Sequence, residues 1–84
     1  PSTRISFDMP VAGLARLTVY NILGQEIVTL MNSVLPAGRT EVVWSGTDQA
    51  GRTVASGIYF YKLTATPTSG NHDFTAIKKM LLLK

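Results

Sequence analysis

The sequence predicts an all-β domain, an immunoglobulin-like β-sandwich of six to seven antiparallel strands. Three observations lead to this prediction. The dominant period of the apolar residues is two rather than 3.6. Short alternating segments recur at roughly ten-residue spacing, with Gly, Pro and Asn between them. Finally, 45% of the 84 residues are hydrophobic and only 15% are charged, which fits one packed domain and argues against disorder. A small β-barrel is the alternative architecture.

The first half of the chain predicts one strand followed by a hairpin. Apolar and polar side chains alternate over residues 4–9, as in a half-buried strand. Two further alternating segments, residues 15–22 and 25–31, flank Gly24, where the chain can turn sharply. Residues 32–38 end in a Leu-Pro-Ala-Gly turn signal and are expected to form a loop.

The second half predicts three to four more strands. Residues 40–44 are rich in β-branched and aromatic side chains and predict a strand. After a glycine-containing loop, residues 52–54 are expected to be a short extended piece. Residues 58–66 form the strongest apolar run and predict a central strand covered on much of both faces. Residues 74–84 could also form a helix, but a strand is expected in an all-β domain.

Composition limits the domain organisation. Residues 1–84 are expected to form a single domain, with Trp44 as an anchor of its core. No cysteine is present, so neither a disulfide framework nor a zinc–thiolate site can form. No apolar run approaches the roughly 20 residues that span a bilayer. The chain starts at Pro1 without a signal peptide, so we expect it to be a segment of a longer protein.

Few residues are candidates for catalysis. His72 lies beside Asp73 and could act as a general base, but a solvated loop tip is the expected role. There is no Gly-x-Ser-x-Gly motif. Residues 46–53 are similar to a phosphate-binding loop with Arg52 in place of lysine, but extended residues rather than a helix follow them. Asp48 is expected to accept hydrogen bonds from loop amides, as in Asx turns. A calcium site usually needs several carboxylates, and one Asp does not supply them. The prediction is therefore a protein that is not an enzyme and has no cofactor-binding or metal site.

The charge pattern argues against nucleic acid as a partner. The net charge is only +3. Nucleic-acid-binding proteins usually carry a basic stripe, whereas the basic residues here are scattered, apart from Lys78, Lys79 and Lys84.

Five blocks of the sequence together form a pattern that covers nearly the whole chain: residues 2–10, 17–27, 36–51, 55–63 and 78–84. The fourth block contains Ser-Gly-x-Tyr-x-Tyr-x-Leu at residues 56–63. In their order and spacing, the five blocks resemble the type A C-terminal sorting domain of the type IX secretion system. The same pattern is shared with a related module, the immunoglobulin-like domain of the flagellar hook-capping protein.

The resemblance implies a non-catalytic sorting or anchoring module at the C-terminus of a larger secreted protein. Its partners would be the outer-membrane secretion machinery and, within the same chain, an N-terminal cargo domain. The cargo would travel through the periplasm and outer membrane and be secreted or held at the cell surface.

The C-terminal segment is the candidate recognition strand. Lysines flank an apolar run here, and a strand at a sheet edge can pair with a partner's strand. The candidate residues are Lys78, Lys79, Met80, Leu81, Leu82, Leu83 and Lys84. In the alternative interpretation, Met80 and Leu82 fill the core while the lysines are solvated.

Two other functions compatible with the sequence are considered. In one, the chain is a structural or adhesive module that self-associates by edge-strand pairing in a surface filament or cap. In the other, it binds carbohydrate through exposed tyrosines, with Tyr20, Tyr59 and Tyr61 as candidates. Two of these tyrosines fall in the most apolar strand, which favours packing in the core.

Overall fold

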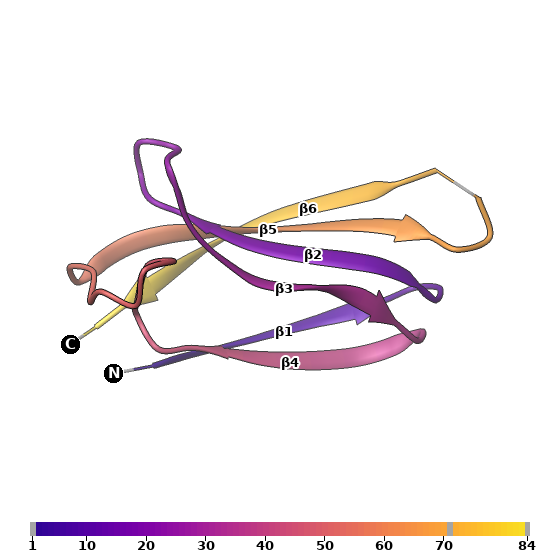
Figure 1. Cartoon of the computed structure of the whole chain (residues 1–84), viewed down its shortest axis with the longest axis horizontal. Coiled ribbons are helices and arrows are strands. Elements are labelled where there is room, and N and C mark those ends of the chain that lie inside the picture. The colour runs from indigo at the N-terminus through magenta and orange to yellow at the C-terminus, as the bar shows by residue number, and fades with distance from the viewer. Residues whose placement is uncertain (1, 71, 84) are drawn as a thin grey trace.

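A computed structural model confirms the immunoglobulin-like β-sandwich (Figure 1). It describes residues 2–70 and 72–83. Six strands are found in this part of the chain: β1 Thr3–Met9, β2 Gly13–Tyr20, β3 Glu26–Leu35, β4 Gly38–Trp44, β5 Gly57–Pro67 and β6 Phe74–Leu82. Within it, no helix is long and apolar enough to cross a membrane.

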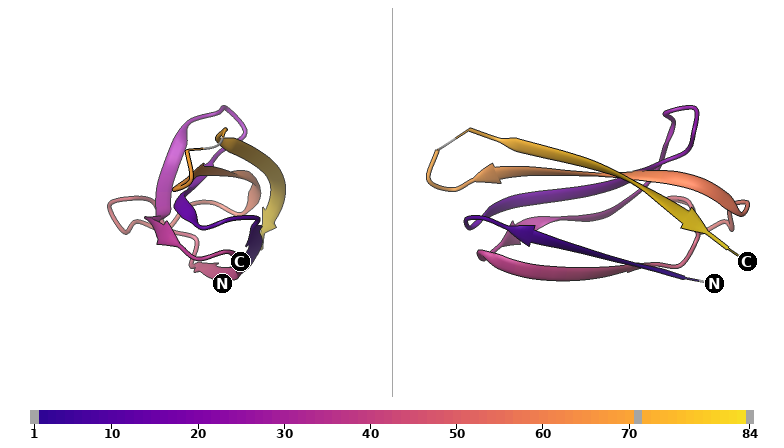
Figure 2. Two further views of the ribbon diagram at one scale, coloured as in Figure 1. Left: turned by 90° about the vertical axis from the view of Figure 1, so that its right-hand side faces the viewer. Right: turned by 180° about the vertical axis from the view of Figure 1, so that it is seen from behind.

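The strands form two antiparallel sheets. One sheet contains β1 and β4, and the other has the order β3-β2-β5-β6. The hairpin predicted around Gly24 is therefore confirmed as β2–β3, and β5 is a central strand as predicted. The start of β1 and the end of β6 lie at the same end of the molecule in both views (Figures 1 and 2).

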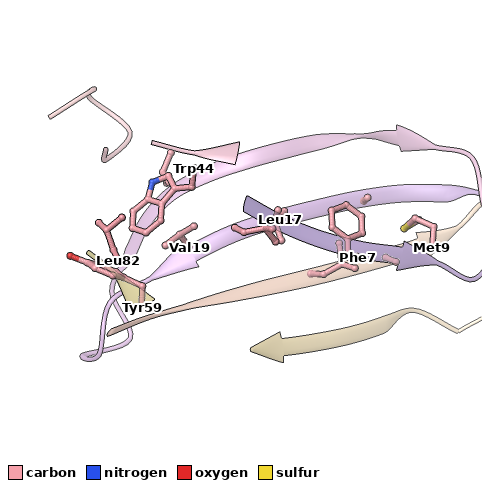
Figure 3. Close-up of a cluster of buried hydrophobic side chains, with 12 residues drawn as sticks. Phe7, Met9, Leu17, Val19, Trp44, Tyr59 and Leu82 are labelled. Atoms are coloured by element: carbon pink, nitrogen blue, oxygen red, sulfur yellow. The ribbon is translucent and has the colours of Figure 1, made fainter. Parts of the chain in front are cut away.

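The core lies between the two sheets and follows from the alternation of side chains. Ile5, Phe7 and Met9 of β1 are buried, whereas Arg4 and Asp8 are exposed. Each sheet contributes a row of inward side chains, because successive residues of a strand point to opposite faces. Figure 3 shows this row between the sheets.

Trp44 anchors one end of the core, as predicted. Its side chain is 1% exposed, and its ring meets that of Tyr59 edge-on at a centroid distance of 5.0 Å. The indole N–H donates to the carbonyl oxygen of Thr47 at 2.9 Å. The buried ring therefore leaves no unpaired polar atom, which would be costly in an apolar environment.

The loop predicted at residues 32–38 is wrong for its first four residues and for Gly38, where β4 begins. β3 continues to Leu35, and Leu35 lies opposite Gly13 at the start of β2. The polar side chains of Asn32 and Ser33 suggested a loop, but they lie on an exposed stretch of the strand. Pairing with β2 provides hydrogen-bond partners for the backbone of this stretch.

Two other strand predictions need correction. The extended piece at 52–54 is only an isolated bridge between Thr47 and Thr53, so the part of the chain that the structure describes has six strands rather than seven. β5 is covered on its inner face but not on both, since Ile58 is 44% exposed. The last segment is a strand, as predicted, and β6 ends at Leu82.

Candidate interaction surface

The predicted recognition strand lies at the edge of the four-stranded sheet. Among the described residues, β6 pairs only with β5, so its other edge has no strand partner. Lys78, Lys79 and Leu81 are exposed, and Met80 is half-buried. Lys84 lies outside the described residues. This arrangement keeps both interpretations open, because the strand contributes to the core and also presents an open edge.

Leu82 fixes the end of β6 in the core. Its side chain is fully buried beside Trp44 and Tyr59 (Figure 3). It packs on Gly46, where an added Cβ would come within 3.2 Å of Leu82 Cδ2. Gly46 also has a φ of 74°, a left-handed conformation that favours glycine. The strand is thus held at its C-terminal end while its edge remains open.

The outer face of β5 and β6 is apolar and cationic. Ile77 and Leu81 are 63% and 55% exposed, and Leu81 lies opposite Ile58 of β5. Lys79 lies opposite Phe60 in the same register. Lysine side chains are thus interleaved with exposed aliphatic side chains on one face.

The structure separates the charged residues into two groups. Each of the four arginines lies within 4 Å of a carboxylate: Arg4 with Glu41, Arg16 with Glu26, Arg39 with Asp8, and Arg52 with Asp48. Among the described residues, no ion pair involves Lys62, Lys78 or Lys79. The four lysines of the sequence and Asp73 remain, which accounts for the net charge of +3. The unbalanced positive charge of the described residues is therefore on β5 and β6.

A cavity of about 300 Å³ lies between β6 and the two-stranded sheet. Its lining includes aromatic and aliphatic side chains of both sheets, with charged groups among them: Ser6, Phe7, Asp8, Arg39, Tyr61, Leu63, Phe74, Ala76 and Lys78. No strand pairing joins β1 to β6 in the described part of the chain. The cavity is therefore bordered by two strands that each have an unpaired edge.

The opposite edge of the same sheet is covered. The backbone N–H of Gln49 donates to the carbonyl oxygen of Ile27 in β3 at 3.0 Å. The side-chain Oε1 of Gln49 accepts the N–H of Thr29 at 3.1 Å. One loop residue thus occupies the ladder positions that a further strand would use, and it protects this part of the edge.

The loop that carries Gln49 is organised by Asp48, as predicted. Its Oδ1 accepts the backbone N–H of Arg52 at 2.9 Å and that of Ala50 at 3.0 Å. The Arg52 amide, followed by that of Ala50 and the Arg52 guanidinium, holds the pKa of Asp48 below its ordinary value of 3.8. Among the described residues, no group of three or more His, Asp or Glu side chains could hold a metal ion. The role of the Asp48 carboxylate is therefore to accept the hydrogen bonds that hold the loop together.

The remaining candidates do not converge on a site. His72 is exposed in the connection between β5 and β6. Tyr59 is buried and Tyr61 packs against the core, whereas Tyr20 is paired with Phe60 on the other face, with Lys62 Nζ 5.3 Å from its ring centroid. The three tyrosines therefore do not share one stacking surface.

Sequence reasoning missed the exposed aliphatic residues of this surface and the cavity beside it. Ile77 and Leu81 alternate with Met80 and Leu82, so the period of two in this segment could have separated the outer from the inner face. The cavity had no sequence signal, because its lining comes from four strands.

Comparison with known proteins gives a consistent result. The family model of the FlgD Ig-like domain matches residues 2–71. The fold is shared with FlgD from P. aeruginosa, at 20% sequence identity and a TM-score of 0.78 over 98% of this chain. It is also shared with FlgD from Xanthomonas campestris, at 26% identity and a TM-score of 0.72 over 95% of this chain. The chain spans 60% and 54% of those two chains. No curated protein matches it significantly.

These findings overturn the interpretation as a type IX sorting domain. The matching family is the FlgD Ig-like domain, and both solved structures above are FlgD proteins. Of the two modules that the sequence blocks resemble, the comparisons thus support the second. The predicted partners, an outer-membrane secretion machinery and a cargo domain in the same chain, are wrong for the same reason. So is the predicted route through the outer membrane to the cell surface.

Proposed function

The chain belongs to the FlgD Ig-like domain family, and from this membership we propose that it is a non-catalytic structural module of a cap-like protein assembly. The family match is the observation that carries the proposal. The X. campestris relative is described as giving insights into the hook capping essential for flagellar assembly. A structural role also fits a surface on which the described acidic residues and His72 form no metal-binding group.

We place the module within a longer protein, with residues 1–84 as one domain. The two FlgD chains are considerably longer than the part that this chain spans. The six strands share one core, so the domain has what it needs to fold as a unit.

The contact with neighbouring subunits is assigned to β6, with Lys78, Lys79, Met80, Leu81, Leu82 and Leu83 as its interaction strand. The support is the unpaired edge of β6 together with the exposed Ile77 and Leu81 beside it. Strand addition at such an edge provides affinity through main-chain hydrogen bonds and specificity through alternate side chains.

The test is sedimentation velocity of the full-length protein that contains this domain, over a concentration series. Wild type is expected to form oligomers. Ile77→Glu removes an exposed apolar side chain from β6 and should raise the association midpoint about tenfold or more, because the docked edge loses an apolar contact and gains a negative charge that must be desolvated. Leu14→Glu is the matched control, since Leu14 is also exposed but lies on the central strand β2.

Two results would contradict the proposal. One is a full-length protein that stays monomeric throughout the series. The other is an equal effect of Ile77→Glu and Leu14→Glu, because the edge of β6 would then have no special part in assembly.

A further inference from the structure

The cavity lies between two strands, β1 and β6, that diverge along their length (Figure 2), and its borders suggest what fills it. The two strands run close together near the start of β1 and the end of β6, and they diverge towards the other end (Figure 2). The cavity lies in the diverging half, beside residues 6–8 of β1 and 74–78 of β6. A water molecule occupies about 30 Å³ in the liquid. The cavity, at about 300 Å³, is much larger than this and can hold side chains of a partner.

We infer that this cavity accepts an extended segment of a neighbouring protein, which adds to β6 as a strand and alternates apolar with acidic residues. The unpaired edge of β6 offers backbone groups to such a segment, as in other cases of strand addition. One face of an added strand would then point into the cavity and the other would continue the outer face of the sheet.

The apolar half of the alternation follows from the cavity lining. Phe7, Leu63 and Phe74 contribute apolar surface, and the small side chain of Ala76 leaves space at the centre of β6. The charged pair near the opening, Asp8 and Arg39, is joined by a 3.7 Å contact between its own members. Aliphatic side chains of an inserted segment would therefore gain contacts without separating a charge from its partner.

The acidic half follows from the unpaired lysines. Lys79 is exposed on the outer face of β6, the face on which the side chains of the added strand that do not enter the cavity would lie. Lys62 lies opposite Ile77 in the β5–β6 register, and β6 itself contains no carboxylate. Carboxylates on the added strand would thus meet cations that no described residue neutralises.

A second copy of this domain fits the cavity less well. Antiparallel pairing of two β6 strands would bring the lysines of both copies together, and like charges on opposed strands are destabilising. The β1 and β4 edges carry carboxylates that already pair with Arg4 and Arg39. Part of the β3 edge is covered by Gln49. The segment is therefore assigned to a part of a neighbouring protein outside this fold.

The inference rests on the proposed function only in that a neighbouring subunit supplies the segment. Its test uses the 84-residue chain alone, labelled for NMR, and reads amide hydrogen exchange along β6. The probe is a capped nine-residue peptide of alternating Val and Glu, matched to the nine residues of β6. Hydrogen exchange should slow roughly tenfold at saturation for the β6 amides that point away from β5, because these amides gain a hydrogen-bond partner.

Two controls make this result specific. The same peptide with Lys in place of Glu should give no protection. Ala76→Phe fills the cavity and should abolish protection, whereas Thr75→Phe places the same ring on the exposed face of β6 and should preserve it. If Ala76→Phe alters the thermal unfolding of the chain, Lys79→Glu replaces it and should reverse the preference between the two peptides.

Several results would overturn the inference. These are equal protection by both peptides, protection that persists in Ala76→Phe with its fold intact, and no protection at millimolar peptide. Protection of β6 that grows with protein concentration in the absence of peptide would assign the cavity to a second copy. The sedimentation experiment on the full-length protein reads assembly separately, so either proposal can fail without the other.

Discussion

Asp48 shows how one side chain can organise a whole connection. Its carboxylate accepts two backbone amides, and its Oδ2 lies 3.3 Å from Nε of Arg52. Its own backbone N–H donates to the carbonyl oxygen of Arg52 at 2.8 Å, which closes the turn. The turn presents the next residue, Gln49, to β3. The charge on Asp48 is thus linked to the stability of the loop.

This linkage predicts a pH-dependent effect of Asp48→Asn. The pKa of Asp48 is lowered in the folded chain, chiefly by the Arg52 amide. Its stabilising contribution is therefore present above the ordinary value of 3.8 and is lost as the pH falls through the lowered pKa. Wild type should have the higher Tm at neutral pH, and the difference from Asp48→Asn should shrink in strong acid. Thermal denaturation followed by circular dichroism measures both values. Asp73→Asn is the control for loss of a carboxylate, and a difference for Asp48→Asn that grows in acid would contradict the assignment.

Residue roles that depend on one side chain can be predicted from the sequence. Trp44 was expected in the core because it brings the largest apolar surface, and it is 1% exposed. Asp48 was expected to accept loop amides because Asp does so in glycine-containing turns, and it does. The role of Gln49 was not predictable, since it depends on a loop reaching a strand about twenty residues earlier in the chain.

At the scale of elements, the two edges of the four-stranded sheet differ. Gln49 covers part of the β3 edge with one main-chain and one side-chain hydrogen bond. The β6 edge has no such cover within the described residues. An exposed strand edge is a template for pairing, so the sheet directs association towards one side.

Gln49→Ala should open the covered edge at one position. The Thr29 amide would lose its acceptor, while the main-chain bond from residue 49 to Ile27 would remain. Exchange of the Thr29 amide should accelerate roughly two- to twelvefold, which corresponds to a net hydrogen-bond contribution of about 0.5–1.5 kcal/mol. NMR hydrogen exchange measures this change. Gln25→Ala is the matched control, because Gln25 bonds Asn21 in the β2–β3 turn and does not touch Thr29. Unchanged exchange at Thr29 would show that the side-chain bond does not protect this edge.

The strands themselves were largely predictable, and their ends were not. Alternation with period two located all six, because one face of each strand is buried against the other sheet. The extension of β3 to Leu35 was missed because its exposed residues are polar and its structure comes from pairing with β2. Composition describes the side chains of such a stretch but does not identify its partner strand.

At the scale of the whole molecule, the open edge and the cavity arise from unequal sheets. Four strands face two, so the two-stranded sheet leaves part of β6 uncovered. Strand order cannot be deduced from alternation alone, which is why the cavity was not predicted. The family was also misjudged at this scale, because two related modules share the same sequence blocks and the match to the FlgD Ig-like domain separates them.

The unequal sheets are joined by side-chain packing, and this predicts cooperative unfolding. No strand pairing links the two sheets among the described residues, and Leu17 lies fully buried between them. Leu17→Ala should cost about 2–5 kcal/mol, a large share of the roughly 4–13 kcal/mol expected for a domain of this size.

Two probes test whether the whole molecule responds as one unit. The only tryptophan of the sequence, Trp44, reports on the two-stranded sheet by fluorescence, and far-UV circular dichroism reports on all strands. Both urea transitions should shift together in Leu17→Ala, because removing the leucine weakens the packing that holds both sheets. Val34→Ala, at a 65% exposed position of β3, should stay within about 0.5 kcal/mol of wild type. Separate transitions for the two probes would mean that the four-stranded sheet keeps its structure without the two-stranded sheet, and that the shared core does not couple them.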